Sequence, residues 1–145
     1  MPGFLGSYAG TLDAKNRLHI PSRLRQGTDQ SLDTCFLTLG LGGPLFLFPK
    51  TEWRRVEAKL ENFNFANPEA NFVIRMLMAN TVEAAPDRQH RILIPPDLAA
   101  KVGIEKDVKI VGMIRRIEIW DTKRFDEYVA GFGKTYDDVA AELFQ

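Results

Sequence analysis

The chain has 145 residues, no net charge and a hydrophobic fraction of 45%, which suits one compact domain with a real core and excludes a disordered chain. Its apolar runs are far shorter than the about 20 residues of a membrane span. Its first residues lack the basic start and long apolar stretch of a signal peptide, so we expect a cytoplasmic protein that does not bind membranes. The charge is uneven: residues 1–25 carry four basic and one acidic side chain (net +3), and residues 121–145 carry three basic and six acidic ones (net −3). We therefore expect a basic end and an acidic end.

In the first half of the chain, apolar positions and turn residues predict short strands and helices in a fixed order. A tight turn forms at the motif Asp13-x-x-x-Arg17, between an extended stretch and a short return strand. Pro21 ends that strand, because proline cannot extend a hydrogen-bonded ladder. The expected elements are an extended stretch at 7–12, a strand at 17–20, a short helix at 22–26, a strand pair at 34–39 and 45–48, and a helix at 51–62.

A further helix is predicted to start at Asn67, because asparagine is a favoured N-cap residue and proline at the next position suits the first helical turn. It continues through Phe72, Val73, Met76 and Leu77. This helix has no counterpart later in the chain, and we interpret it as a connector between two similar halves.

The second half of the chain repeats the first. Its turn motif is Asp87-x-x-x-Arg91, and the aligned blocks are residues 12–24 with 86–98 and residues 45–53 with 117–125. The expected elements are an extended stretch at 82–85, a strand at 91–94, a helix at 96–102, a strand pair at 108–112 and 115–120, and a last helix from about 123 to 143, weakened by Gly131 and Gly133. One repeat alone would leave an open apolar face and bare strand edges. Two copies can close a barrel, which predicts an α+β, mainly β fold.

The sequence resembles the MraZ family of transcriptional regulators. The resemblance covers roughly residues 4–130 and includes the duplication, and it rests on residues 4–8, 12–21, 91–98 and 117–120 and on Trp53. It implies a duplicated swapped-hairpin β-barrel of the AbrB/SpoVT type with flanking helices. The implied parts are a first repeat at 1–62, a helical connector at 63–80, and a second repeat with the C-terminal helix at 81–145. It also implies a nucleoid-associated, ring-like homo-oligomer that binds repeated promoter boxes on double-stranded DNA in a cell-division and cell-wall gene cluster.

The turns depart from the family pattern at one position. Most members carry glycine before the arginine of each motif, whereas this chain has Asn16 and His90. Both residues tolerate a positive φ better than most non-glycine residues. We therefore expect both turns to form.

The resemblance places DNA contact at the N-terminal copy of the motif. A two-stranded ribbon fits the major groove, and a turn between its strands would present Arg17 to a guanine edge and Lys15 to a phosphate, with Asp13 bracing the guanidinium. The contrary interpretation is an ordinary surface ion pair between Asp13 and Arg17, with solvated charges elsewhere. The expected DNA-binding residues are Asp13, Lys15, Asn16, Arg17, His19, Arg23 and Arg25.

The second copy of the motif, with Asp87, Arg88 and Arg91, has two interpretations that stay open. It can form a second DNA contact, or it can hold subunits together in the ring. We favour the assembly role, because the resemblance puts DNA contact at the N-terminal copy. Charge alone does not decide, since Arg88 stands where the first copy has Ala14.

The sequence gives little sign of catalysis. It contains no Gly-rich phosphate loop, no His-x-x-x-His and no Cys-x-x-Cys pattern, and the lone Cys35 is expected to be buried. Asp13 and Asp87 are related by the duplication, as the carboxylates of an aspartic-protease dyad are, but long charged residues follow them. We expect no enzyme activity, cofactor, metal or small-molecule substrate. The alternative function is a non-enzymatic ring scaffold or an antitoxin-like protein-binding module.

Overall fold

The computed structural model describes residues 3–26 and 30–145. Within these ranges the elements are β1 (Ser7–Thr11), β2 (Arg17–His19), α1 (Ser22–Gln26), β3 (Cys35–Leu39), β4 (Leu45–Pro49), α2 (Lys50–Glu61), α3 (Pro68–Ala79), β5 (Val82–Ala84), β6 (Arg91–Leu93), α4 (Pro96–Lys101), β7 (Asp107–Gly112), β8 (Ile117–Asp121), α5 (Thr122–Ala130) and α6 (Tyr136–Leu143). The chain is therefore a mixed α and β protein, as expected. Helical residues outnumber strand residues, so the expectation of a mainly β fold is wrong.

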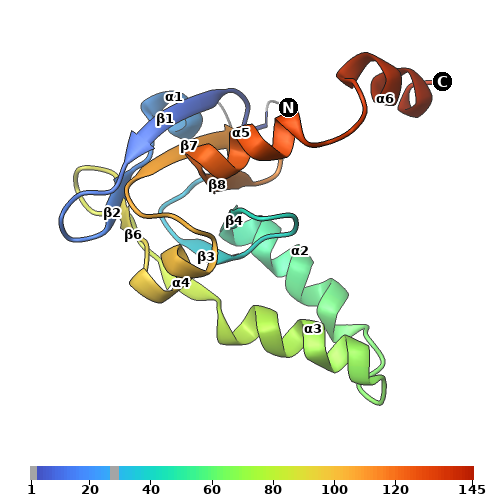
Figure 1. Ribbon diagram of the computed structural model, residues 1–145. Helices are drawn as coiled ribbons and strands as arrows, with labels where there is room; N and C mark the ends of the chain where they lie inside the picture. Colours follow the sequence, from blue (N-terminus) through green and yellow to red (C-terminus); the bar gives the residue numbers. More distant parts are fainter. Residues whose placement is uncertain (1–2, 27–29) are drawn as a thin grey trace.

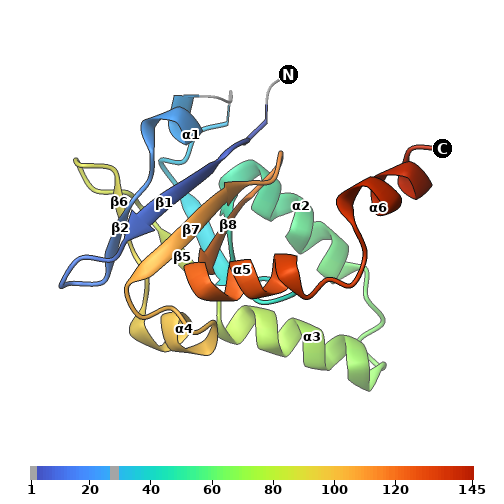
Figure 2. The ribbon, with the colours of Figure 1, turned by 45° about the horizontal axis from the view of Figure 1, so that its top comes forward.

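The strands form two antiparallel sheets (Figures 1 and 2). The larger sheet has the order β1-β7-β8-β4-β3-β5, and β2 pairs with β6 in a separate two-stranded sheet, which we call the ribbon. In the described part of the chain the larger sheet is open, with β1 and β5 at its edges. The closed barrel expected from the resemblance is therefore not confirmed.

The two halves of the chain exchange strands. β1 pairs with β7, with Tyr8 opposite Ile110, and β5 pairs with β3, with Val82 opposite Leu37. The ribbon combines β2 of the first half with β6 of the second. Each tight turn thus joins two strands that pair with other partners. The expectation that the ribbon consists of the two strands flanking one turn is wrong, because each half contributes one of its strands.

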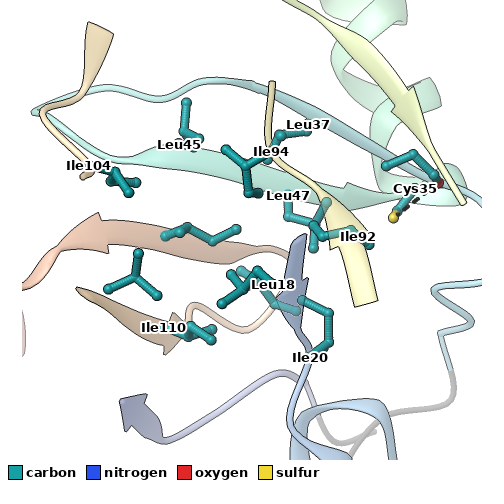
Figure 3. Close-up of a cluster of buried hydrophobic side chains, with 14 of the residues drawn as sticks. Leu18, Ile20, Cys35, Leu37, Leu45, Leu47, Ile92, Ile94, Ile104 and Ile110 are labelled. Atoms are coloured by element: carbon teal, nitrogen blue, oxygen red, sulfur yellow. Dashed lines mark hydrogen bonds between the residues drawn. The ribbon is translucent and has the colours of Figure 1, made fainter. Parts of the chain in front are cut away.

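One core fills the space between the ribbon and the larger sheet (Figure 3). Leu18, Ile20, Ile92 and Ile94 are each at most 1% exposed. Burying each of these side chains is worth about 1.5–3 kcal/mol. Cys35 lies in the same core, and burial raises the pKa of its thiol to about 12, which leaves it unreactive at neutral pH. Since both halves contribute to this core, neither half can bury its apolar face alone.

The C-terminal segment forms two helices where the sequence predicts one. α5 ends at Ala130 with Gly131 as its C-cap, and Gly133 has a φ of 85°, a left-handed conformation that glycine adopts without a steric penalty. The hydroxyl of Thr135 then accepts a hydrogen bond of 3.1 Å from the backbone N–H of Asp138 and so caps α6. Two glycines followed by a new N-cap favour a break over a continuous helix.

α3 begins at Pro68 with Asn67 as its N-cap, as predicted; the Asn67 side chain accepts hydrogen bonds from the backbone N–H groups of Glu69 and Ala70. None of its residues is buried. Its exposed apolar side chains are Phe72, Val73, Met76 and Met78. Among the described residues, no helix has both the length and the apolar character needed to cross a membrane.

Candidate nucleic-acid interface

In the first turn, Asp13 holds both the backbone and the arginine side chain. Its Oδ1 accepts hydrogen bonds of 2.9 Å from the backbone N–H groups of Lys15 and Arg17, and its Oδ2 accepts one of 2.8 Å from the Arg17 Nε. Asn16 supplies the positive φ of 60° that closes the turn. The brace expected between Asp13 and Arg17 is therefore present.

The second turn repeats this arrangement. The Oδ1 of Asp87 accepts hydrogen bonds of 2.9 Å from the Gln89 N–H and 3.0 Å from the Arg91 N–H, and its Oδ2 accepts one of 2.9 Å from the Arg91 Nε. His90 has a φ of 61°. Asparagine in the first turn and histidine in the second thus both take the left-handed conformation that favours glycine, and the prediction that both turns form is confirmed.

These hydrogen bonds lower the pKa of both aspartate carboxyls below the ordinary value of 3.8. The largest cause is the backbone N–H of Arg17 at Asp13 and the backbone N–H of Arg91 at Asp87. An aspartic-protease dyad instead needs one carboxyl with a raised pKa, because two adjacent carboxylates cannot both ionise. The pair therefore lacks the electrostatic signature of such a dyad.

The ribbon brings the two arginines to one surface. Arg17 lies opposite Leu93, and His19 lies opposite Arg91, while the residues between them on each strand point into the core. Because side chains alternate along a strand, these four side chains share the outer face, which we call the ribbon face. Arg91 Nη1 also lies 3.8 Å from Asp13 Oδ2, an ion pair that joins the two halves. The two motifs therefore form one cluster.

The remaining predicted site residues flank the ribbon face. Lys15 is exposed in the first turn, and Arg88 is exposed in the second. Arg23 is exposed on α1, whereas Arg25 is half-buried and its Nε donates a hydrogen bond of 3.2 Å to the backbone carbonyl of Ile20. The Arg25 side chain thus helps to hold α1 against the end of the ribbon, and its Nε is already used in this hydrogen bond.

One residue of the ribbon face was absent from the expected site. Leu93 is 55% exposed. The sequence does contain a signal for it, because Ile92 and Ile94 alternate into the core and the residue between them must point outward. In the duplication it occupies the place of His19.

The ribbon with its basic residues and the acidic start of α6 lie far apart in the structure. The two turns and the ribbon lie at one end of the molecule, and α6 with the C-terminus lies at the other (Figure 1). α6 carries Asp137 and Asp138 in its first turn. The carboxylates at the start of α6 are therefore remote from the ribbon face, and their charge does not oppose an anion that approaches the two arginines.

The lowered pKa values predict how stability depends on pH. Each carboxyl is more acidic in the folded chain than in the unfolded one, so its stabilising contribution is complete above the ordinary pKa and is lost as pH falls through the lowered value. The double variant Asp13→Asn/Asp87→Asn keeps one acceptor oxygen at each turn for the backbone N–H groups, loses the oxygen that accepts from the arginine Nε, and cannot titrate. Urea unfolding should show a flatter loss of its free energy of unfolding between about pH 5 and about pH 2 than in the unmodified protein. Equal pH dependence in the two proteins would contradict this role.

Comparison with known proteins gives a consistent result. A family model described as "MraZ protein, putative antitoxin-like" matches residues 4–76 and again residues 77–145. The chain is 39% identical over 141 residues to the transcriptional regulator MraZ of Heliobacterium modesticaldum, with 97% of this chain and 96% of the relative covered. The proteins of the same name from Lactobacillus delbrueckii subsp. bulgaricus and Carboxydothermus hydrogenoformans are 38% and 34% identical over 140 residues, with the same coverage of both chains. The chain belongs to the MraZ family.

Proposed function

We propose that this protein is a transcriptional regulator that binds double-stranded DNA through the ribbon face. The observation that carries the proposal is the placement of Arg17 and Arg91, one from each half, on the same outer face of a two-stranded ribbon, where their side chains are 31% and 27% exposed. Its relatives are named transcriptional regulators, and this naming supports a regulatory and non-enzymatic function. We extend the proposal to the repeated promoter boxes, the cell-division and cell-wall gene cluster and the nucleoid association implied by the resemblance.

The chemistry of the ribbon face suits a major groove, which admits a two-stranded β-ribbon. Each arginine is held by its aspartate through Nε, and in the described part of the chain neither donates a hydrogen bond through an Nη group; Arg91 Nη1 lies 3.8 Å from Asp13 Oδ2, an ion pair beyond hydrogen-bond distance. The Nη groups can therefore donate to the O6 and N7 of a guanine. Lys15 and Arg88, exposed in the two turns, are placed to meet phosphates on either side. Asn16, His19, Arg23 and Arg25 complete the proposed surface.

For the second motif, the geometry favours contact with DNA over a role in assembly. The sequence favoured an assembly role for Asp87, Arg88 and Arg91. However, Arg91 shares the ribbon face with Arg17 and lies 3.8 Å from Asp13. A surface that buried Arg91 between subunits would also cover much of the first motif. We therefore propose that both motifs contact the same stretch of DNA.

Alanine substitution of each arginine tests this proposal. Arg17→Ala and Arg91→Ala should each weaken binding to a duplex selected from a random-sequence pool by about 1–3 kcal/mol, or roughly 5- to 150-fold in Kd, because each loses a bidentate contact to a base. Arg17→Lys should keep salt-dependent binding to unselected DNA but lose the preference for the selected duplex. Gel shifts at two salt concentrations would measure both effects.

The matched control is Lys134→Ala, which removes a positive charge from the linker between α5 and α6, far from the ribbon (Figure 1). It should bind like the unmodified protein. Equal affinity of the Arg17→Ala, Arg91→Ala and unmodified proteins for the selected duplex would reject the ribbon face as the binding surface.

We further propose that the chain assembles into a ring. α3 exposes an apolar face, and a second exposed apolar surface includes Tyr128, Val129 and Phe132 on and after α5. Two different exposed apolar surfaces on one subunit favour head-to-tail contacts. Such contacts close into a ring when the rotation between neighbouring subunits permits. A ring that presents several ribbons to repeated boxes gains affinity through effective concentration. In the proposed division into repeats 1–62 and 81–145 with a connector at 63–80, α3 belongs to the connector, and we propose that it also makes the contact between subunits.

Phe72→Asp/Met76→Asp should reduce the mass measured by light scattering at micromolar protein, because it places two charges on the apolar face of α3. Arg75→Ala, an exposed change on the same helix, should leave the mass unchanged. A monomeric unmodified protein would refute the ring.

The alternative is a non-enzymatic ring scaffold or an antitoxin-like module that binds a protein; the description of the matching family model contains the words "putative antitoxin-like". The two functions predict different consequences of salt. DNA binding through the ribbon face should weaken steeply as salt rises, because phosphate contacts release counterions.

A further inference from the structure

An exposed leucine lies on the ribbon face, within the proposed DNA-binding surface. Leu93 is 55% exposed and lies directly opposite Arg17 in the ribbon. Directly opposed residues on one face have Cβ atoms about 4.5–5.5 Å apart. Backbone hydrogen bonds from Ile94 to Asn16 and from Ile20 to His90, 2.8 and 2.9 Å long, extend the ladder beyond both strands and fix this register.

The two halves differ at this position. The duplication places His19 where the second half has Leu93, so the ribbon face carries one imidazole and one apolar side chain beside its two arginines. The strand positions that flank Leu93 are filled by buried isoleucines, which fixes the orientation of its side chain toward solvent. Its exposed side chain therefore lies on the same face of the ribbon as Arg17 and Arg91.

We infer that Leu93 is a specificity-determining residue that contacts the C5 methyl group of a thymine beside the base read by Arg17. This inference rests on the proposed function. The thymine methyl is the one apolar group that a base edge presents in the major groove, and apolar side chains are its usual partners. Successive bases of a strand are about 3.4 Å apart along the axis, so a side chain opposite Arg17 reaches the same base pair or its neighbour. In this arrangement Arg17 and Arg91 can read guanine edges, and Leu93 adds a preference for thymine at a neighbouring position.

Uracil provides a direct test, because it differs from thymine only by lacking the methyl group. A duplex is first selected from a random-sequence pool with the unmodified protein, and each thymine is then replaced singly by deoxyuridine. Loss of one buried methyl contact should weaken binding about 3- to 10-fold at one position. Leu93→Ala should weaken binding to the selected duplex by a similar factor and show no further loss with uracil at that position.

The matched control is Leu41→Ala, which truncates a leucine that is 82% exposed in the loop between β3 and β4. It should keep the full affinity and the full effect of uracil. The inference is overturned if no uracil substitution weakens the unmodified protein, if the effect persists undiminished in Leu93→Ala, or if Leu93→Ala changes the oligomeric mass. Failure of the unmodified protein to select any sequence would instead reject the proposed function itself.

Discussion

The pairing of β2 with β6 is the interaction on which the rest of the molecule depends. Each strand has only three residues, too few for an independent hairpin. Their inner residues, Leu18 and Ile92, are 1% exposed and close one side of the shared core. A slip of one residue in this register would turn the arginines inward and the aliphatic side chains outward. Burial of the inner face therefore determines what the outer face presents.

The same pairing converts two similar motifs into one composite surface. Each aspartate fixes its own turn and the Nε of its own arginine, so the guanidinium groups are largely oriented before any ligand arrives. Orientation in advance reduces the conformational entropy lost on binding. The ion pair between Asp13 and Arg91 extends this order across the two halves. The two halves repeat the same turn and strand but differ at His19 and Leu93. Equivalent positions of the ribbon face therefore carry an imidazole in one half and an apolar side chain in the other.

Local signals allowed the turns, the duplication and most elements to be predicted from the sequence. Asp13-x-x-x-Arg17 and its repeat carry their own hydrogen-bonding partners, and Pro21 marks the end of a strand. Strand partners were not predictable in this way. The pairing of β1 with β7 joins residues far apart in sequence, and the residue pattern of a strand does not specify which other strand it pairs with. The break before α6 was indicated by Gly131 and Gly133, but a single helix was expected. Leu93 is absent from the predicted site because that prediction rests on charged and polar residues, and only the alternation of side chains along the strand indicates that Leu93 points outward.

Amide hydrogen exchange, measured with and without a selected duplex, tests the central claim most directly. If the ribbon is one composite surface, DNA should slow exchange in residues 14–19 and in residues 88–93 together, while exchange in α2 and α6 stays unchanged. Slower exchange in the first segment alone would show that the second half does not share the surface. Protection confined to the C-terminal helices would show that the ribbon face does not bind DNA.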